Sequence, residues 1–344
     1  MTNFEFRGRS RTVAIALLAL GASLISPVAT AAPEDVLVHD LAQSAAEQQA
    51  VRDYWTPERI ARLEVGDPGP GGPPENGPDG ASVPPGTALD RTVGRLFFVG
   101  RGEDSSCTAT LVRSANRSTL VTGGHCVHTA DLLGRDPQWH EKVLWAPGFR
   151  DNTMPNGAFV ARSLVVHRTW REDDQQSNFD QAFVVLGPDA KGRKAEDGVI
   201  AQSLAIGLPG GLPATEFGYP RAARKPGHQG RPEFTGMRLA KCWGTPRRDL
   251  GDAEHPSSPD MWGLGCDMGG GSSGGPRIAL LNDHLGLGAV VGVNTQGGYL
   301  DGKGNRCESP RPGQQPAPGC TRFLTGPQFT PAITGKLYAS ASHR

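Results

Sequence analysis

The sequence predicts an all-β fold for the region after residue 91, and three observations support this. Glycine and proline contribute 47 and 29 of the 344 residues, which is too many for a helical bundle and suits short strands joined by turns. No sustained helical stripe is visible there except in residues 327–342, which are predicted to form a closing helix. Short runs of strand-type residues recur between turn signals, at residues 92–100, 107–114, 118–124, 142–148, 159–167, 181–187, 277–281 and 287–298.

The first 31 residues have the pattern of a signal peptide. Arg7, Arg9 and Arg11 precede an apolar run at residues 12–26, and Ala29-Thr30-Ala31 fits the small-x-small rule for cleavage before Ala32. The apolar run is too short to remain as a transmembrane helix, although an uncleaved anchor is the alternative. We therefore expect a secreted, extracellular protein without stable membrane association after cleavage.

Two further segments precede the β-rich region. Residues 32–65 are predicted to form two short helices, broken before Pro57, and to be a pro-region of a zymogen. Residues 66–90 are rich in proline and glycine and are predicted to be a linker to a domain at residues 91–344. The alternative for the first segment is a permanent extension that is never removed.

Charge and cysteine content limit the classes of function. Equal numbers of acidic and basic residues, 35 of each, give no electrostatic footprint for nucleic acid. Six cysteines in an exported protein indicate up to three disulfides, and the count alone leaves fifteen pairings open. A zinc site would need a Cys-x-x-Cys spacing that the sequence lacks, so we expect no metal and no organic cofactor.

The stretch GGGSSGGP at residues 269–276 contains two candidate nucleophiles. A serine hydroxyl needs an imidazole to take its proton and a carboxylate to orient that imidazole. His125 in LVTGGHCV and Asp180 before an apolar run give the order His, Asp, Ser. The stretch also fits the Gly-x-Ser-x-Gly elbow of α/β-hydrolases, but that fold requires an acid and then a histidine after the serine, and no credible set follows Ser273.

Three blocks together resemble one family. TGGHC at 122–126, FDQAFVVL at 179–186 and GSSGGP at 271–276 resemble the motifs of chymotrypsin-like (trypsin-fold) serine peptidases, and most closely the secreted bacterial branch that includes the glutamyl endopeptidases. The resemblance covers residues 91–340. It implies two packed six-stranded antiparallel β-barrels with the active site in the cleft between them. It also implies a serine-type endopeptidase that acts on polypeptides, and we expect a monomer.

The resemblance assigns a role to each catalytic residue. Ser273 attacks the scissile carbonyl, His125 is the general base and Asp180 orients His125. The backbone N–H groups of Gly271 and Ser273 are expected to form the oxyanion hole. Ser272 stands where the family has an aspartate, which favours Ser273 as the nucleophile. It also excludes activation by an ion pair between a new N-terminus and that aspartate.

The resemblance also indicates disulfides and substrate contacts. Cys107 with Cys126 matches the disulfide beside the family's catalytic histidine, and we expect Cys242 to pair with Cys266 and Cys307 with Cys320. Asp267 stands where trypsin-like members carry a specificity aspartate, whereas the glutamyl branch has a histidine near residues 293–295 that is absent here. The residues expected to contact substrate are Asp267, Asn294, Thr295, Gln296 and Gly297, the last two as an edge for an extended peptide.

Two other classes of function remain as alternatives. One is a catalytically inactive trypsin-fold binding protein, which the presence of all three of His125, Asp180 and Ser273 argues against. The other is an esterase that uses the same triad, since activated esters and peptide amides both yield to this chemistry.

Overall fold

The computed structural model describes residues 34–63, 80–129, 137–173, 175–223, 228, 230–254, 256–311 and 314–344. The predicted signal peptide lies outside these residues, as does most of the predicted linker. The proposed domain boundaries therefore stay predictions. Among the described residues, no helix has both the length and the apolar character needed to span a membrane.

The first half of the β-rich region forms a closed antiparallel barrel of six strands. They follow the order β9-β10-β5-β4-β3-β8, and pairing of β8 with β9 closes the barrel. The barrel core contains large side chains that exclude solvent, including Leu96, Trp145 and Leu164. The strands are β3 (Val93–Gly100), β4 (Glu103–Val112), β5 (Thr119–Thr122), β8 (Glu141–Pro147), β9 (Phe159–His167) and β10 (Ala182–Leu186).

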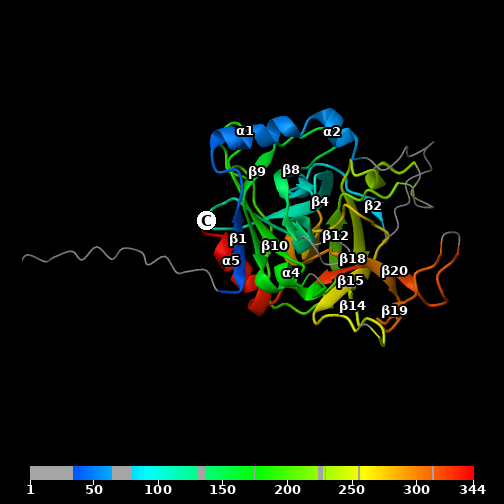
Figure 1. Ribbon diagram of the computed structural model, residues 1–344. Coiled ribbons are helices and arrows are strands. Elements are labelled where there is room, and N and C mark those ends of the chain that lie inside the picture. Colours follow the sequence, from blue (N-terminus) through cyan, green and yellow to red (C-terminus); the bar gives the residue numbers. More distant parts are fainter. Residues whose placement is uncertain are drawn as a thin grey trace, which may run out of the picture. The chain divides into compact units, whose positions relative to one another are not determined.

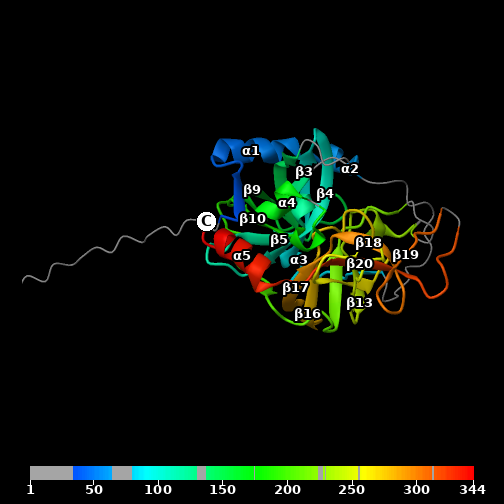
Figure 2. The same ribbon diagram turned by 60° about the horizontal axis from the view of Figure 1, so that its bottom comes forward.

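The second half forms two sheets that together make the second barrel, which is only partly closed. A bridge between Gly292 and Gln328 and the disulfide Cys242–Cys266 connect the sheets. Figures 1 and 2 show most of these strands in yellow-green to orange beside the green and cyan strands of the first barrel. One sheet contains β11 (Ser203–Leu204), β17 (Leu287–Val293), β16 (Pro276–Asn282), β12 (Ala214–Gly218), β13 (Ala240–Gly244) and β2 (Ala81–Ser82), and the other β14 (Arg247–Arg248), β15 (Met261–Gly265), β20 (Thr321–Pro327), β18 (Gln296–Leu300) and β19 (Arg306–Cys307).

The two-barrel architecture confirms the predicted fold class. The expected C-terminal helix is also present, as a π-helical turn at Pro331–Gly335 followed by α5 (Lys336–Ala341). The remaining short elements are α3 (Leu89–Thr92), η1 (Gly124–Cys126), β6 (His128–Thr129), β7 (Gln138–Trp139), α4 (Arg168–Glu172), η2 (Ser177–Phe179) and η3 (Pro232–Phe234).

The N-terminal segment has the two expected helices, α1 (Ala45–Tyr54) and α2 (Pro57–Ala61). Ser44 and Glu47 form a capping box at the start of α1, and Thr56 caps α2 with Pro57 in its first turn. The helices pack beside β8 and β9 (Figure 1). The sequence analysis did not predict the strand that precedes them, β1 (Val36–Asp40).

Strand β1 extends the first barrel. It pairs with the end of β9, from Ser163 to His167, which β8 leaves unpaired because β8 contacts only the start of that strand. Further along the segment, Trp55 is 3% exposed, and its indole N–H donates to the carbonyl of Lys142 at 2.6 Å. Its ring lies 5.4 Å from the ring of Phe97. The N-terminal segment thus belongs to the hydrophobic cluster on the outer face of the first barrel, which also contains residues of the second barrel.

The last residues of the predicted linker have regular structure. They form β2, which pairs with β13, and the start of α3. Buried Ala81 and Leu89 account for this order, since each adds apolar surface to the core. The sequence analysis missed these two contacts, because the proline and glycine content of residues 66–90 predicted a linker throughout.

The second barrel contains a buried ion pair between Glu216 of β12 and Arg277 of β16, both fully buried. The guanidinium also donates to the backbone carbonyls of Gly326 and Pro327 and to the Gln328 side chain, at 3.2–3.4 Å. Burial raises the pKa of Glu216 to about 8, because the nearby guanidinium only partly offsets desolvation. The Glu216–Arg277 pair therefore connects β12 and β16 with β15 and β20.

Substitution of Trp55 with alanine tests whether the N-terminal segment belongs to the folded barrel. We expect a loss of about 3–5 kcal/mol in the free energy of unfolding, since the change removes a large buried ring. Urea denaturation of the purified protein measures it. The matched control is Arg59→Gln, which breaks a partly exposed ion pair with Asp104 and is expected to leave the unfolding midpoint nearly unchanged. An unchanged unfolding midpoint for Trp55→Ala would mean that the segment contributes nothing to the fold.

Candidate active site

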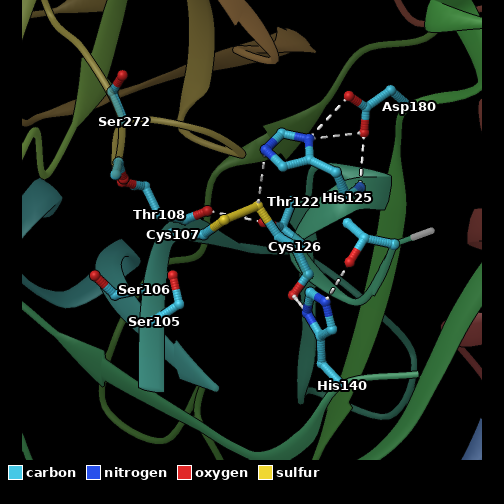
Figure 3. The surroundings of a disulfide bond; sticks show 12 residues. Ser105, Ser106, Cys107, Thr108, Thr122, His125, Cys126, His140, Asp180 and Ser272 are labelled. Atoms are coloured by element: carbon cyan, nitrogen blue, oxygen red, sulfur yellow. Dashed lines mark hydrogen bonds and ion pairs between the residues drawn. A yellow bond between two sulfur atoms is a disulfide. The ribbon is translucent and has the colours of Figure 1, made fainter. Parts of the chain in front are cut away.

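His125 lies in a short 3-10 turn, η1, directly after β5. The next residue, Cys126, forms a disulfide with Cys107 of β4, so the turn is fixed to the neighbouring strand (Figure 3). The His125 side chain remains 27% exposed. The sequence thus places an accessible imidazole on a covalently restrained turn at one edge of the first barrel.

Asp180 orients this imidazole. It follows the turn η2 and precedes β10, and its side chain is 6% exposed. Its Oδ2 lies 2.9 Å from His125 Nδ1, and its Oδ1 accepts the backbone N–H of His125 at 2.8 Å (Figure 3). Burial alone would lower the pKa of His125, but the charge and hydrogen bond of Asp180 outweigh burial, and the pKa is raised. The pair leaves Nε2 as the ring nitrogen that Asp180 does not contact, and it lies 3.8 Å from Cys126 Sγ.

The loop that carries Ser273 is held against the first barrel by Thr108 of β4. The Thr108 backbone N–H donates to the Ser273 carbonyl at 2.8 Å, and its hydroxyl donates to the Gly271 carbonyl at 2.9 Å. The same hydroxyl accepts the backbone N–H of Tyr219 at 2.9 Å. One residue of the first barrel therefore positions two segments of the second.

The residue after Ser273 makes a close approach that only glycine allows. Gly274 has φ +74°, and a Cβ there would lie 2.0 Å from Thr122 Oγ1 and 2.8 Å from the backbone nitrogen of Gly123. Ser273 is therefore placed beside the turn that carries His125. Within the described residues, the Ser273 hydroxyl makes no hydrogen bond to His125 or to another group. Such bonds are often absent until substrate binds.

Gly271 gives the loop the geometry expected of an oxyanion hole. Its φ is +95°, in the region that favours glycine. Among the described residues, the backbone N–H groups of Gly271 and Ser273 have no hydrogen-bond acceptor. These two N–H groups flank Ser272 and are the donors that an oxyanion hole at this loop would use.

Ser272 stabilises the loop from within. It is fully buried, and both its hydroxyl and its backbone N–H donate to the Gly269 carbonyl, at 2.5 and 3.1 Å. The loop conformation thus depends on a neutral local contact and requires no buried ion pair at this position.

The predicted substrate contacts fall into two groups. Asn294 is fully buried, and its backbone pairs with Gly274 and Gly275 while its side-chain amide donates to the carbonyl of Phe217 at 3.0 Å. It supports the serine loop from behind. Thr295, Gln296 and Gly297 follow at the start of β18, which pairs with β20 along one edge.

Asp267 contacts a histidine and an arginine. Its carboxylate lies 2.6 Å from Nε2 of the buried His228 and 3.1 Å from Nε of Arg322. A cationic substrate side chain would have to compete with both groups for this carboxylate. The sequence analysis did not anticipate this cluster, because neither His228 nor Arg322 lies in a recognisable motif.

All six cysteines form disulfides, in the three expected pairs Cys107–Cys126, Cys242–Cys266 and Cys307–Cys320. Cys107, His125 and Cys126 place potential ligand atoms within 4.8 Å of one another. Both sulfurs are oxidised in the disulfide, however, and metal binding by cysteine requires the thiolate. This cluster therefore does not fit a metal site.

Comparisons with known proteins agree with the fold. No protein-family model and no curated protein matches the chain. Among solved structures, it is similar to the protease Anisep from Arthrobacter nicotinovorans (24% identity, TM-score 0.57, covering 77% of this chain and all of the protease). It is also similar to AL20, a thermostable serine protease from an extremophilic microorganism (26% identity, TM-score 0.57, covering 75% of this chain and all of AL20). A Glu endopeptidase matches at 18% identity and TM-score 0.52, covering 77% of this chain and 97% of its own.

The chain has the trypsin fold. The likeness to bacterial serine proteases supports a serine-type endopeptidase. Thr108 is the main supporting residue that the sequence analysis missed, although its place next to Cys107 in CTAT could have indicated it.

Substitution of Thr108 with valine tests the contact between the barrels. Valine keeps the shape but leaves the Gly271 carbonyl and the Tyr219 N–H buried without a partner, so we expect a loss of about 2 kcal/mol or more in stability. We also expect a fall in kcat of about tenfold or more as Gly271 loses its fixed orientation. Thr108→Ser is the control, since it keeps the hydroxyl. Equal kcat in Thr108→Val and Thr108→Ser would show that the hydroxyl does not position the loop.

Proposed function

We propose that this protein is a secreted serine endopeptidase in which Ser273, His125 and Asp180 form the catalytic triad. The observation that carries the proposal is the His125–Asp180 pair, which lies beside a serine loop with two unpaired backbone N–H donors. An oriented imidazole, a solvent-accessible hydroxyl and an anion hole are together the requirements for acyl transfer, and Ser273 is partly exposed.

The chemistry follows from these positions. As the Ser273 hydroxyl oxygen forms a bond to the scissile carbonyl carbon, its proton moves to His125 Nε2, and the carbonyl oxygen becomes an oxyanion bound by Gly271 and Ser273 N–H. The imidazolium, stabilised by Asp180, donates that proton to the leaving nitrogen as the C–N bond breaks. Water then repeats the sequence on the acyl-enzyme and releases the acid. Each oxyanion donor is worth about 3 kcal/mol of barrier.

Substrate backbone is proposed to add as an antiparallel strand along Gln296 and Gly297. Because Asp267 is already paired with Arg322 and His228, we do not propose a preference for lysine or arginine before the scissile bond. The histidine of the glutamyl branch is also missing, because Val293, Asn294 and Thr295 occupy that part of the chain. The acyl-side preference is therefore proposed to depend on shape more than on charge.

We propose that residues 34–63 assist folding and do not cover the cleft. Among the described residues, this segment forms no hydrogen bond or ion pair with the serine loop, His125 or Asp180. Its partners are β3, β4, β8, β9 and the C-terminal helix, including an ion pair between Asp35 and Lys336. Secretion and the cleavage site before Ala32 are proposed from the sequence pattern.

Labelling with a fluorophosphonate probe, followed by mass spectrometry of the labelled peptide, tests the nucleophile. We expect labelling on Ser273 that is abolished in Ser273→Ala and retained in Ser272→Ala. Hydrolysis of peptide amides in addition to esters would distinguish an endopeptidase from an esterase. A folded wild-type protein that does not react would favour the trypsin-fold binding protein.

The pH dependence of kcat/KM tests the role of Asp180. The base must be neutral to accept a proton, and Asp180 raises the pKa of His125 above its ordinary value of 6.5. Activity is therefore expected to fall as the pH drops below this raised pKa. Asp180→Asn is expected to shift this acidic limb to lower pH and to reduce kcat by about 10⁴-fold. Asp173→Asn, at an exposed carboxylate, should change neither property. An acidic limb that stays in place in Asp180→Asn would rule out the proposed pair.

A further inference from the structure

Arg221 is a charged residue beside the serine loop that the proposed mechanism does not use. Its backbone N–H donates to the Gly270 carbonyl at 2.6 Å, and a Cβ at Gly271 would lie 3.2 Å from its Cγ. The guanidinium reaches the first barrel, where it donates to the Ser105 hydroxyl at 3.2 Å. The side chain thus borders the proposed oxyanion hole and bridges the two barrels.

Within the part of the chain that the structure describes, no carboxylate neutralises this guanidinium. Arg221 takes part in no ion pair there, and its Nε is buried without a hydrogen-bond partner. Burial lowers the pKa of Arg221, and no neighbouring acidic group offsets that effect. A partly buried cation without a counter-ion is costly unless a ligand supplies the negative charge.

The position of Ser105 indicates which part of a substrate would meet Arg221. Figure 3 shows Ser105 on the opposite side of the Cys107–Cys126 disulfide from His125 and Asp180. Ser105 is three residues along β4 from Thr108, which holds Ser273, and three residues of strand span about 10 Å. The acyl part of the substrate is proposed to occupy the β18 edge, so the part that reaches Ser105 is the leaving-group segment. An extended peptide covers this distance in two to three residues.

We propose that Arg221 selects substrates with an acidic side chain in the first three residues after the scissile bond. The carboxylate of aspartate or glutamate would accept hydrogen bonds from the guanidinium and supply its missing counter-charge. This inference rests on the proposed peptidase function and deepens it, since it names a substrate class through the leaving-group side of the same site. Arg221 acts as a specificity residue and takes no part in bond making.

The test uses matched peptides with amidated C-termini, so that a chain-end carboxylate cannot substitute for the side chain. A peptide-library digest first identifies a sequence that the secreted protein cleaves. Variants of it then carry aspartate or asparagine at the first, second or third position after the scissile bond. We expect kcat/KM to be about tenfold higher or more with aspartate at one of these positions, and the ratio to fall as salt is raised.

Arg221→Gln is expected to reduce the aspartate-to-asparagine ratio to within about twofold. The control is Arg238→Gln, at an exposed arginine paired with Asp151, which should keep the wild-type ratio. An ester substrate that lacks a leaving-group peptide is assayed in parallel to separate the two claims. Two outcomes would overturn the role of Arg221 alone. In the first, the wild type hydrolyses the ester and the peptides, but kcat/KM is equal for the aspartate and asparagine peptides. In the second, the preference for aspartate persists in Arg221→Gln. Absence of all hydrolysis and of probe labelling in the wild type would overturn the proposed function and this inference together.

Discussion

The hydrogen bonds of Thr108 are the contacts on which the site geometry depends. The base and its orienting carboxylate belong to the first barrel, whereas the proposed nucleophile belongs to the second, so the distance between them is set by how the barrels meet. Thr108 fixes that contact by bonding the Ser273 and Gly271 carbonyls and the Tyr219 N–H. Both carbonyls belong to the loop that also carries the N–H groups of the proposed oxyanion hole, so one threonine holds that loop in place.

This constraint explains the composition of the serine loop. Gly271 must take a positive φ, and Gly274 must pass against Thr122 without a side chain. Ser272 then completes the loop with a bond to its own segment, which removes the need for a charged partner from a newly formed N-terminus. Charged groups lie instead at the margins of the site. They are Asp267, which contacts His228 and Arg322, and Arg221, which has no ion-pair partner among the described residues.

The sequence predicted the first barrel better than the second. The strands β3, β4, β5, β8, β9 and β10 are apolar runs between turn signals, and each was predicted. Strands β12, β13, β15 and β20 were missed, because they are short, contain glycine or carry charged residues such as Glu216, whose burial depends on Arg277 some sixty positions later. The strand β1 was missed for a similar reason, since its partner β9 lies more than a hundred residues away. The positions of His125, Asp180 and Ser273 followed from local motifs, but Arg322 and His228 near Asp267 required the tertiary structure.

A crystal structure of the protein after reaction with a phosphonate inhibitor would test the central claim most directly. The account predicts phosphorus bonded to Ser273 Oγ, a phosphoryl oxygen within hydrogen-bond distance of the backbone N–H groups of Gly271 and Ser273, and His125 Nε2 close to the leaving-group position. An adduct on another residue, or a phosphoryl oxygen turned away from Gly271, would contradict it.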